Sequence, residues 1–304
     1  MTIDIMLPYY GDVSLMRATV RSILVQDDPD WRLTVVDDGY PDDSIPGWFS
    51  ALGDDRVRYL RNDHNLGANL NYQKCLSLVE NELVVMMGAD DLMLPNYVRV
   101  VRAAYKAFPD AGIIQPGVEV IDGDGNPSTN LVDQTKKRLY APKVTGRRIG
   151  GGEDLAVSLL RGNWLYFPSL CWRSDAIVNA GFRKGLDVVQ DLALVIDLLQ
   201  AGEQMVVDDT ICFQYRRHRA SDSSWRALAG SRFIEERNYF LDVAERLSAQ
   251  GWDRAAKVAR AHMSSRLHAL TLLPKAIGQR HVEGMRNLSR HAFGPSRHVL
   301  QDHH

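Results

Sequence analysis

The stretch VVMMGADDLMLP, from Val84 to Pro95, decides how the fold is interpreted and raises the question of function. Its apolar run is typical of a buried strand, but the run ends on two adjacent carboxylates, Asp90 and Asp91, and Pro95 follows where a helix can begin. Adjacent aspartates before a helix are often only turn or capping residues. They gain a functional meaning if other strands of the same sheet end in matching chemistry.

The first hundred residues alternate between strand-like and helical patterns. Short β-rich runs lie at 3–8, 32–38, 56–62 and 81–87, and Asp12 can cap a helix with one apolar face. Strands that alternate with helices predict a mostly parallel sheet flanked by helices. We therefore expect an α/β fold with a Rossmann-like central sheet.

The second part of the chain continues this pattern and then becomes helical. Further strands are predicted at 112–122, 166–173 and 204–216, and a helix at 188–201. The segment 122–152 is rich in Gly, Pro and Lys with little apolar periodicity, which predicts a mobile functional loop. From about residue 225 the apolar spacing is helical, so we expect a helical appendage at the C-terminus.

Composition is that of an ordinary globular protein, with 45% hydrophobic and 24% charged residues. The net charge of −2 hides an asymmetry, because residues 254–304 hold nine Lys and Arg against two acids, or +7, which leaves −9 upstream. This tail predicts either a basic surface that contacts an anionic partner such as a membrane, or a solvated basic helix face.

Cysteine usage and hydropathy predict the compartment. Cys75, Cys171 and Cys212 show no C-x-x-C spacing, which fits a reducing compartment better than a disulfide framework or a zinc site. The N-terminus lacks a signal-peptide pattern, and no apolar run approaches about 18 residues. We expect a cytoplasmic protein, either soluble or peripheral to the inner face of the membrane, and no nucleic-acid partner.

Three predicted strands end in residues that can bind a nucleotide: Pro8–Tyr10, Asp37–Gly39 and Gly88–Asp91. In an open α/β sheet, ligands bind beyond the carboxyl ends of the strands. There an aromatic ring can stack on a base, one carboxylate can accept from a base N–H or a ribose hydroxyl, and another can hold a hard divalent cation. The strand ends therefore predict a nucleotide-diphosphate site with a metal.

From about residue 3 to 220 the sequence resembles the family 2 glycosyltransferases of the GT-A fold. The resemblance implies a glycosyltransferase domain over 1–224, with a nucleotide-sugar half at about 1–120 and an acceptor half at about 121–224, followed by a helical region over 225–304. Each motif is weak alone, but six occur in the family's order. They are IMLPYYGD, VQDDPDWRLTVVDDGYPDD, NDHNLGANLN, MMGADDLMLP, VVQDLALVIDLL and YRRHRASDS.

The resemblance also implies roles on the donor side. Asp90 and Asp91, with His218, would bind Mn²⁺ or Mg²⁺, and Arg216 and Arg217 would contact the diphosphate of the sugar donor. UDP is the expected nucleotide, with GDP and dTDP open. The implied nucleotide-binding residues are Pro8, Tyr10, Asp38, Asn65, Gly67, Asn71 and Ala89.

On the acceptor side the resemblance makes Asp191 the general base of an inverting transfer to an acceptor hydroxyl. Asn163, Trp164 and Ser169 would line the acceptor site. The acceptor stays open between a glycan, a lipid-linked sugar and a small molecule, and the C-terminal helices could serve membrane contact or a homodimer. A plain helix cap is the alternative interpretation of Asp191.

The sequence departs from the family pattern at positions that keep alternatives open. Gly88 stands where the first Asp of the D-x-D motif is usual, while Gly11, Tyr40 and Gln190 replace common Asn, Ser and acidic residues. A catalytically degenerate scaffold used for binding or assembly is therefore an alternative. A sugar-phosphate nucleotidyltransferase is less favoured, because LPYYGDVSLMR lacks a Gly-rich basic loop, and an oxidoreductase would need G-x-G-x-x-G after the first strand.

Overall fold

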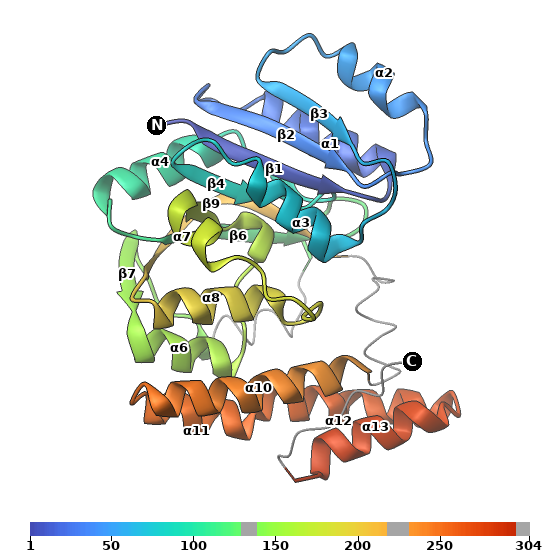
Figure 1. The fold of residues 1–304 in the computed structure, drawn as a ribbon, viewed down its shortest axis with the longest axis vertical. Helices are drawn as coiled ribbons and strands as arrows, with labels where there is room; N and C mark the ends of the chain where they lie inside the picture. The colour runs from blue at the N-terminus through green and yellow to red at the C-terminus, as the bar shows by residue number, and fades with distance from the viewer. Residues whose placement is uncertain (129–138, 218–230, 296–304) are drawn as a thin grey trace.

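The computed structural model describes residues 1–128, 139–217 and 231–295 of the chain (Figure 1). The described strands form one sheet in the order β3-β2-β1-β4-β8-β6-β9-β5, with β7 paired to β9. The first four strands are parallel neighbours, as the alternating sequence pattern predicts. Their bounds are β1 Ile3–Tyr9, β2 Trp31–Asp37, β3 Val57–Arg61 and β4 Leu83–Met86.

The other half of the sheet is mixed rather than parallel. β8 runs antiparallel to both β4 and β6, whereas β9 is parallel to β6 and pairs with antiparallel β5 and β7. The expectation of a mostly parallel sheet is confirmed, with these antiparallel strands as the exception. Their bounds are β5 Leu92–Met93, β6 Ile113–Ile121, β7 Arg147–Gly151, β8 Cys171–Arg173 and β9 Gln204–Arg216.

Two predicted segments differ from the structure. The strand predicted at 166–173 shrinks to β8, because Phe167–Ser169 form a 3-10 turn around Pro168, which has no N–H to donate to a strand. The segment predicted as a loop at 122–152 contains β7 at its end. Residues 129–138 of that segment lie outside the described part.

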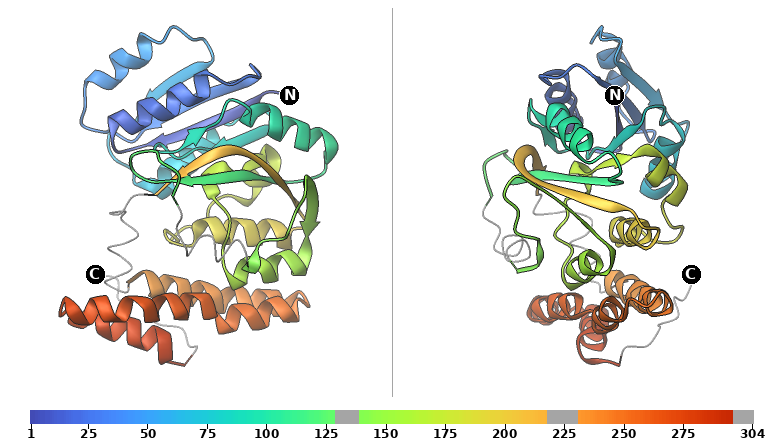
Figure 2. Two further views of the ribbon diagram at one scale, coloured as in Figure 1. Left: turned by 180° about the vertical axis from the view of Figure 1, so that it is seen from behind. Right: turned by 90° about the vertical axis from the view of Figure 1, so that its left-hand side faces the viewer.

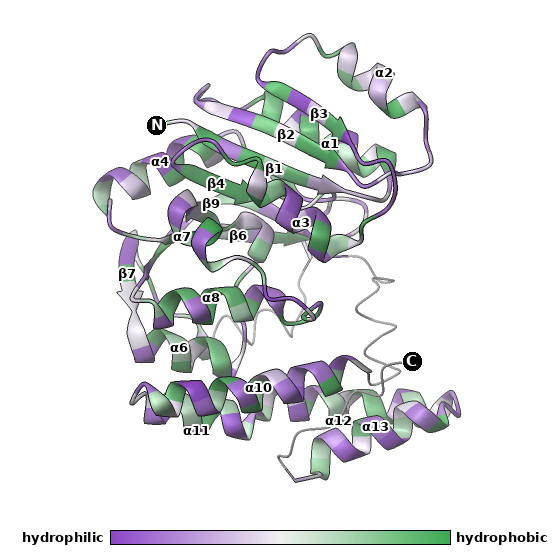
Figure 3. Ribbon diagram, viewed as in Figure 1, coloured by the Kyte–Doolittle hydropathy of each residue, from purple (hydrophilic) through white to green (hydrophobic). Residues whose placement is uncertain are grey.

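Helices cover both faces of the sheet (Figures 1 and 2). The central strands are strongly hydrophobic (Figure 3), which a sheet buried on both faces requires. One core lies between the sheet and α1, α2 and α4, and the other between the sheet and α3, α6, α7 and α8. The bounds are α1 Val13–Leu24, α2 Ser44–Ser50, α3 Ala68–Ser77, α4 Tyr97–Ala107, α6 Gly152–Arg161, α7 Ser174–Ala180 and α8 Gln190–Gln200.

Four C-terminal helices lie below α6 and α8 in the view of Figure 1. Apolar residues of α11 and of the second half of α10 belong to the same core as those of α6 and α8, whereas Phe233 of α10 packs with α12 and α13. The predicted domain boundary at 224/225 falls outside the described residues, so the division into domains stays a prediction. The bounds are α10 Ser231–Ala249, α11 Asp253–Ala261, α12 Met263–Gly278 and α13 Val282–Phe293.

Polar residues are buried where α10, α12 and α13 meet. Ser265 donates its hydroxyl to Glu236 and lies 2.8 Å from Nε2 of His291, while Nδ1 of His262 lies 3.0 Å from the carbonyl of Arg260. Both histidines are almost fully buried. Burial lowers the pKa of His262 to about 4 and that of His291 to about 3, and nearby arginines contribute to both shifts.

None of the helices in the described part of the chain combines the length and the apolar character that a bilayer span requires.

The buried histidines predict that acid destabilises the protein. They are neutral in the folded state, whereas unfolded histidine titrates near pH 6.5, so the unfolded state gains protons first as the pH falls. The contribution of the two histidines to stability should therefore fall as the pH drops from about 6.5 to about 4 for His262 and to about 3 for His291, by roughly 2 kcal/mol per histidine at pH 5. Urea unfolding at pH 7 and pH 5 measures this, and His291→Gln should show a smaller drop. An equal drop in wild type and variant would contradict the assignment.

Candidate functional site

The carboxyl ends of the parallel strands lie along one edge of the sheet. In β1, β2 and β3 the register pairs Tyr9 with Asp37 and Asp37 with Arg61. Since β8 is antiparallel to both β4 and β6, the strands β4, β6 and β9 also end at this edge. The fold therefore brings the strand ends that the sequence singles out to one edge, and the end of β9 lies at the same edge.

Asp38 is buried, and its carboxylate holds the loop that follows β3. Its Oδ1 accepts from Nδ2 of Asn62 at 2.7 Å and from the N–H of Leu66 at 2.8 Å, and its Oδ2 accepts from the N–H of Gly67 at 2.9 Å. Asp37 beside it is buried as well. The carboxylate of Asp38 thus fixes the loop at this edge of the sheet. Its contact with a nucleobase stays a prediction.

The three predicted residues of the following segment lie close together in different surroundings. Asn71 is buried, donates to the carbonyl of Val36 at 3.0 Å and accepts from Asn62 at 3.1 Å. Asn65 is exposed, and its Oδ1 accepts from the N–H of Gly67 at 2.8 Å. Gly67 has φ +82°, which glycine adopts without strain, and it leads into α3. Asn71 therefore anchors the segment, while Asn65 and Gly67 face outward.

Aromatic rings gather at the end of β1. Tyr10 is 56% exposed, and its ring packs edge-on against Tyr40 at a centroid distance of 5.2 Å. Tyr40 also contacts the buried ring of Tyr9 at 5.5 Å. Pro8 and Ala89, also predicted as nucleotide-binding residues, are half-buried. An exposed ring held from the side by a second ring offers a face on which a planar base can stack.

Asp90 and Asp91 form a carboxylate pair at the end of β4. Asp91 is buried, and its Oδ1 accepts from the N–H of Arg216 at 2.8 Å, whereas its Oδ2 has no hydrogen-bond partner among the described residues. A Cβ added at Gly88 would lie 2.4 Å from Oδ2 of Asp91 and 3.2 Å from Oδ1 of Asp90. The two carboxylates thus occupy the space that a side chain at position 88 would need.

Burial raises the pKa of Asp91 well above its usual range, and the charge of Asp90 raises it further, against the effect of the Arg216 N–H. Such a pair fits a hard divalent cation, which takes one or two carboxylates and leaves other positions to waters and phosphate oxygens. In the described ranges no cluster of three or more His, Cys, Asp or Glu is suited to hold a metal, and His218 lies outside those ranges.

The end of β9 places two arginines on opposite sides. Arg216 is buried, and its guanidinium donates to the carbonyls of Asp90 at 2.8 Å, Asp122 at 3.1 Å and Gly123 at 2.9 Å. Arg217, directly after the last residue of β9, is exposed. Arg216 therefore holds the strand ends together, and its contact with a diphosphate stays a prediction.

A pocket of roughly 130 Å³ lies between the start of α8 and the end of β9. Asp191, the second residue of α8, lines it together with Tyr215 and Arg217. The Oδ1 of Asp191 accepts from the N–H of Leu192 at 2.7 Å, and its Oδ2 accepts from Nδ2 of Asn163 at 3.2 Å. Burial raises the pKa of Asp191, which moves this carboxyl toward the range of a general base.

Two of the three predicted acceptor residues line this pocket. Asn163 contacts Asp191, and the indole N–H of Trp164 donates to the hydroxyl of Ser158 at 2.9 Å. Ser169 is fully buried, and its hydroxyl donates to the carbonyl of Tyr166 at 2.7 Å. The structure therefore does not bring Ser169 to the pocket.

Tyr72 is a site residue that the sequence reasoning missed. It is half-buried on α3. Burial is the main cause of the raised pKa of its phenol, and smaller contributions come from the thiol of Cys75 and the charges of Asp91, Asp90 and Asp191. The charges of all three carboxylates thus act on one phenol. The available signal was its position directly after the NDHNLGANLN motif.

The chain is similar to known proteins in sequence. Residues 4–154 match the family described as "Glycosyl transferase family 2". The uncharacterized protein MT1568 of Mycobacterium tuberculosis is 24% identical over 249 residues, which cover 79% of this chain and 74% of the relative. The putative colanic acid biosynthesis glycosyl transferase WcaA of Escherichia coli is 29% identical over 102 residues, or 33% of this chain and 37% of WcaA.

The fold is similar to solved structures. TarS 1-349 of S. aureus in complex with UDP-GlcNAc matches with a TM-score of 0.60 at 11% identity, over 96% of this chain and 90% of TarS 1-349. The mannosyltransferase PcManGT from Pyrobaculum calidifontis in complex with GDP-Man and Mn²⁺ matches with a TM-score of 0.58 at 14% identity, over 95% and 85% of the two chains. The expected GT-A fold with C-terminal helices is confirmed.

The surroundings of Asp91 predict that Asp91→Asn stabilises the metal-free protein at neutral pH. The folded pKa of this carboxyl lies above its unfolded value, so the stability of the wild type falls as the pH rises through the folded pKa. Asparagine stays neutral and can still accept from Arg216. We expect a gain of the order of 1–2 kcal/mol at pH 7, the usual size for relieving a buried unsatisfied group, and a smaller gain at pH 4.5.

Urea unfolding in the presence of a chelator measures this difference at both pH values. A loss of stability in Asp91→Asn that is the same at pH 4.5 and pH 7 would contradict the cost of burying this carboxylate with one oxygen unpartnered.

Proposed function

Through residues 4–154 the chain belongs to glycosyl transferase family 2 and is a glycosyltransferase, and on this premise we propose an inverting, metal-assisted transfer with Asp191 as general base. The donor is a nucleotide-diphosphate sugar, and the acceptor supplies a hydroxyl. The product belongs to a polysaccharide or another glycoconjugate. The fold agrees with that of solved structures that bind UDP-GlcNAc and GDP-Man.

One observation carries the proposal: the last residues of β9 connect the carboxylate pair with the pocket of Asp191. Arg216 binds the carboxylate of Asp91 through its N–H and the main-chain carbonyl of Asp90 through its guanidinium, while its chain neighbours Tyr215 and Arg217 line the pocket. A diphosphate beside the pair and an acceptor in the pocket would therefore meet at β9.

Asp191 has the surroundings of a base for an acceptor hydroxyl. Its raised pKa gives it a stronger affinity for a proton than an exposed aspartate has. Asn163 and the N–H of Leu192 orient both of its oxygens. Because a single base activates the acceptor and no second nucleophilic carboxylate lines the pocket within the described residues, a direct displacement with inversion is the simplest reaction.

The leaving diphosphate needs compensation of its charge as the bond to the sugar breaks. Arg217 is exposed at the pocket and can contact a phosphate oxygen, while Arg216 keeps the strand ends in place. A divalent ion held by Asp90 and Asp91, Mn²⁺ or Mg²⁺, would neutralise part of the diphosphate charge. His218, which lies outside the described residues, is proposed as a further ligand of this ion.

The nucleotide belongs at the ends of β1 and β2. The exposed face of Tyr10 supports stacking of a base, and the outward-facing Asn65 and Gly67 supply polar atoms near the ribose. We propose UDP as the nucleotide, with GDP and dTDP as the alternatives to screen.

The acceptor and the cellular location follow from the charge of the tail. The basic segment 254–304 favours an acceptor attached to an anionic membrane or a homodimer through the C-terminal helices. The three cysteines are buried free thiols, which suits a reducing cytoplasm. We therefore place the reaction in the cytoplasm, at the inner face of the membrane if the acceptor is a lipid-linked sugar.

Asp191→Asn tests the proposed base. An asparagine keeps the hydrogen bond with Asn163 but cannot take a proton, so sugar transfer should fall by at least about 100-fold. Nucleotide affinity, measured by calorimetry, should stay within about twofold, because the proposed partner of Asp191 is the acceptor hydroxyl and not the nucleotide. Asp55→Asn, at an exposed aspartate before β3, is the matched control. Turnover near that of the wild type would mean that Asp191 is not the base.

Asp90→Ala tests the proposed cation site. In wild type, Mn²⁺ should tighten binding of the nucleoside diphosphate by about tenfold or more, which corresponds to about 1.4 kcal/mol. The variant should lose this gain and keep the metal-independent affinity, whereas the exposed-site variant Asp63→Ala should behave as wild type. If the metal-dependent gain survives in Asp90→Ala, the cation binds elsewhere.

A further inference from the structure

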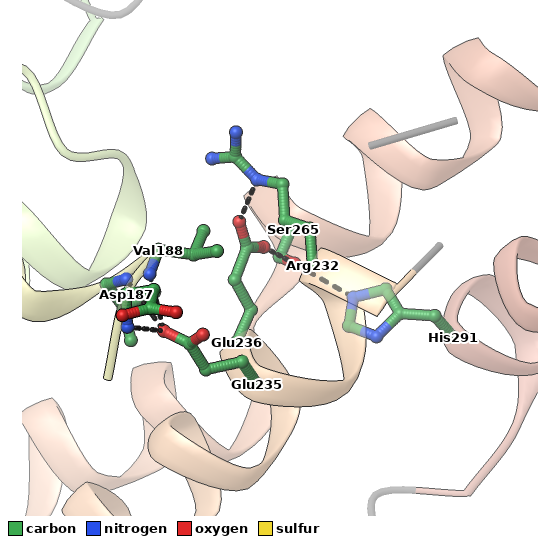
Figure 4. A network of polar contacts seen from close by, with 8 residues as sticks. Asp187, Val188, Arg232, Glu235, Glu236, Ser265 and His291 are labelled. Atoms are coloured by element: carbon green, nitrogen blue, oxygen red, sulfur yellow. Dashed lines mark hydrogen bonds and ion pairs between the residues drawn. The ribbon is translucent and has the colours of Figure 1, made fainter. Parts of the chain in front are cut away.

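Glu235, on the first turns of α10, contacts the segment that leads into α8. Its Oε1 accepts from the N–H groups of Asp187 at 3.0 Å, Val188 at 2.7 Å and Val189 at 3.1 Å (Figure 4). Three consecutive main-chain donors therefore point at one carboxylate oxygen. This geometry holds the backbone of 187–189 in one conformation, because each N–H would lose its partner if the segment moved.

The segment 187–189, which donates to Glu235, ends two residues before Asp191. Val189 is the N-cap of α8, and its apolar side chain makes no capping hydrogen bond within the described structure. Glu235 supplies from another helix the negative group that a helix N-terminus favours. The direction in which α8 starts, and with it the position of Asp191, thus depends on a carboxylate of the C-terminal helices.

α10 is itself held in place by buried polar contacts. Glu236, next to Glu235, forms an ion pair with Arg232 at 2.6 Å and accepts from Ser265 of α12, which contacts His291 of α13 (Figure 4). Side chains of α10 also share a core with α8. Arg232 adds a charge effect: burial raises the pKa of Asp191, and the positive charge of Arg232 counteracts part of that rise.

We propose that Glu235 is a positioning residue for Asp191, so that the C-terminal helices complete the catalytic site of the transferase instead of serving only as an appendage. The inference rests on the proposed function, because it assigns to Glu235 the alignment of the general base. Glu235 acts through the backbone of 187–189 and touches neither donor nor acceptor.

A second carboxylate at the same junction provides a matched control. Glu153 of α6 accepts from the N–H groups of Arg254 at 2.7 Å and Ala255 at 3.1 Å, at the start of α11. Glu153 thus caps the start of a C-terminal helix from the side of the sheet domain, whereas Glu235 contacts the start of α8 from a C-terminal helix. The helix that Glu153 caps does not carry Asp191. Removing either carboxylate deletes hydrogen bonds to the main chain at a helix start, but only Glu235 contacts the segment next to Asp191.

The experiment compares Glu235→Ala, Glu235→Gln and Glu153→Ala with wild type in the full chain. The first readout is kcat and donor KM for sugar transfer or donor hydrolysis. The second is amide hydrogen exchange of residues 186–192, which needs no activity. Glu235→Ala should lower kcat about tenfold or more, with donor KM within about twofold, because misplacing a catalytic group reduces turnover and the nucleotide site is untouched.

Exchange of 186–192 should accelerate in Glu235→Ala, and Glu235→Gln should recover most of both readouts, since its amide oxygen can accept the same N–H groups. Glu153→Ala should leave kcat and the exchange of this segment as in wild type. Unchanged exchange or unchanged kcat in Glu235→Ala would overturn the inference, and so would an equal loss in Glu153→Ala. An inactive wild type would count against the proposed function, while the exchange comparison would still decide whether Glu235 holds the segment.

Discussion

The site depends on the buried carboxyl group of Asp91, whose ionisation is opposed by burial and by the charge of Asp90. Asp91 receives one hydrogen bond from Arg216, its second oxygen has no partner in the described structure, and Asp90 lies beside it. Burying such a group is costly unless a counter-charge arrives. The glycine at position 88 leaves the space that the two carboxylates occupy. The departure from the D-x-D pattern is thus part of the local geometry and is compatible with cation binding.

The sequence predicted what depends on strand order and local pattern. The apolar runs and their polar ends locate β1, β2 and β4, and the parallel arrangement then brings Asp38 and Asp90 to one edge. The pattern did not show that the carboxylate of Asp38 is used by the loop at 62–67, or that the guanidinium of Arg216 binds backbone carbonyls. Both depend on side-chain directions that arise only in the packed chain.

The contact between α10 and α8 could not be predicted from the sequence, for a related reason. Glu235 is 46 residues away from Val189, and its capping role comes from tertiary packing, without any local motif that would mark it. An apolar N-cap such as Val189 is the visible sign that the cap comes from elsewhere. The short β8 and the burial of Ser169 follow from the 3-10 turn at Phe167–Ser169, which an apolar run alone does not reveal.

In the proposed reaction the carboxylate pair and Asp191 face the same diphosphate. A crystal structure with a nucleoside diphosphate and Mn²⁺, with the ion located by its anomalous scattering, tests this most directly. We expect an ion coordinated by Asp90 or Asp91 and by phosphate oxygens. The outer phosphate of the diphosphate should point toward the pocket of Asp191. An ion bound away from both aspartates, or a diphosphate on another face of the sheet, would contradict it.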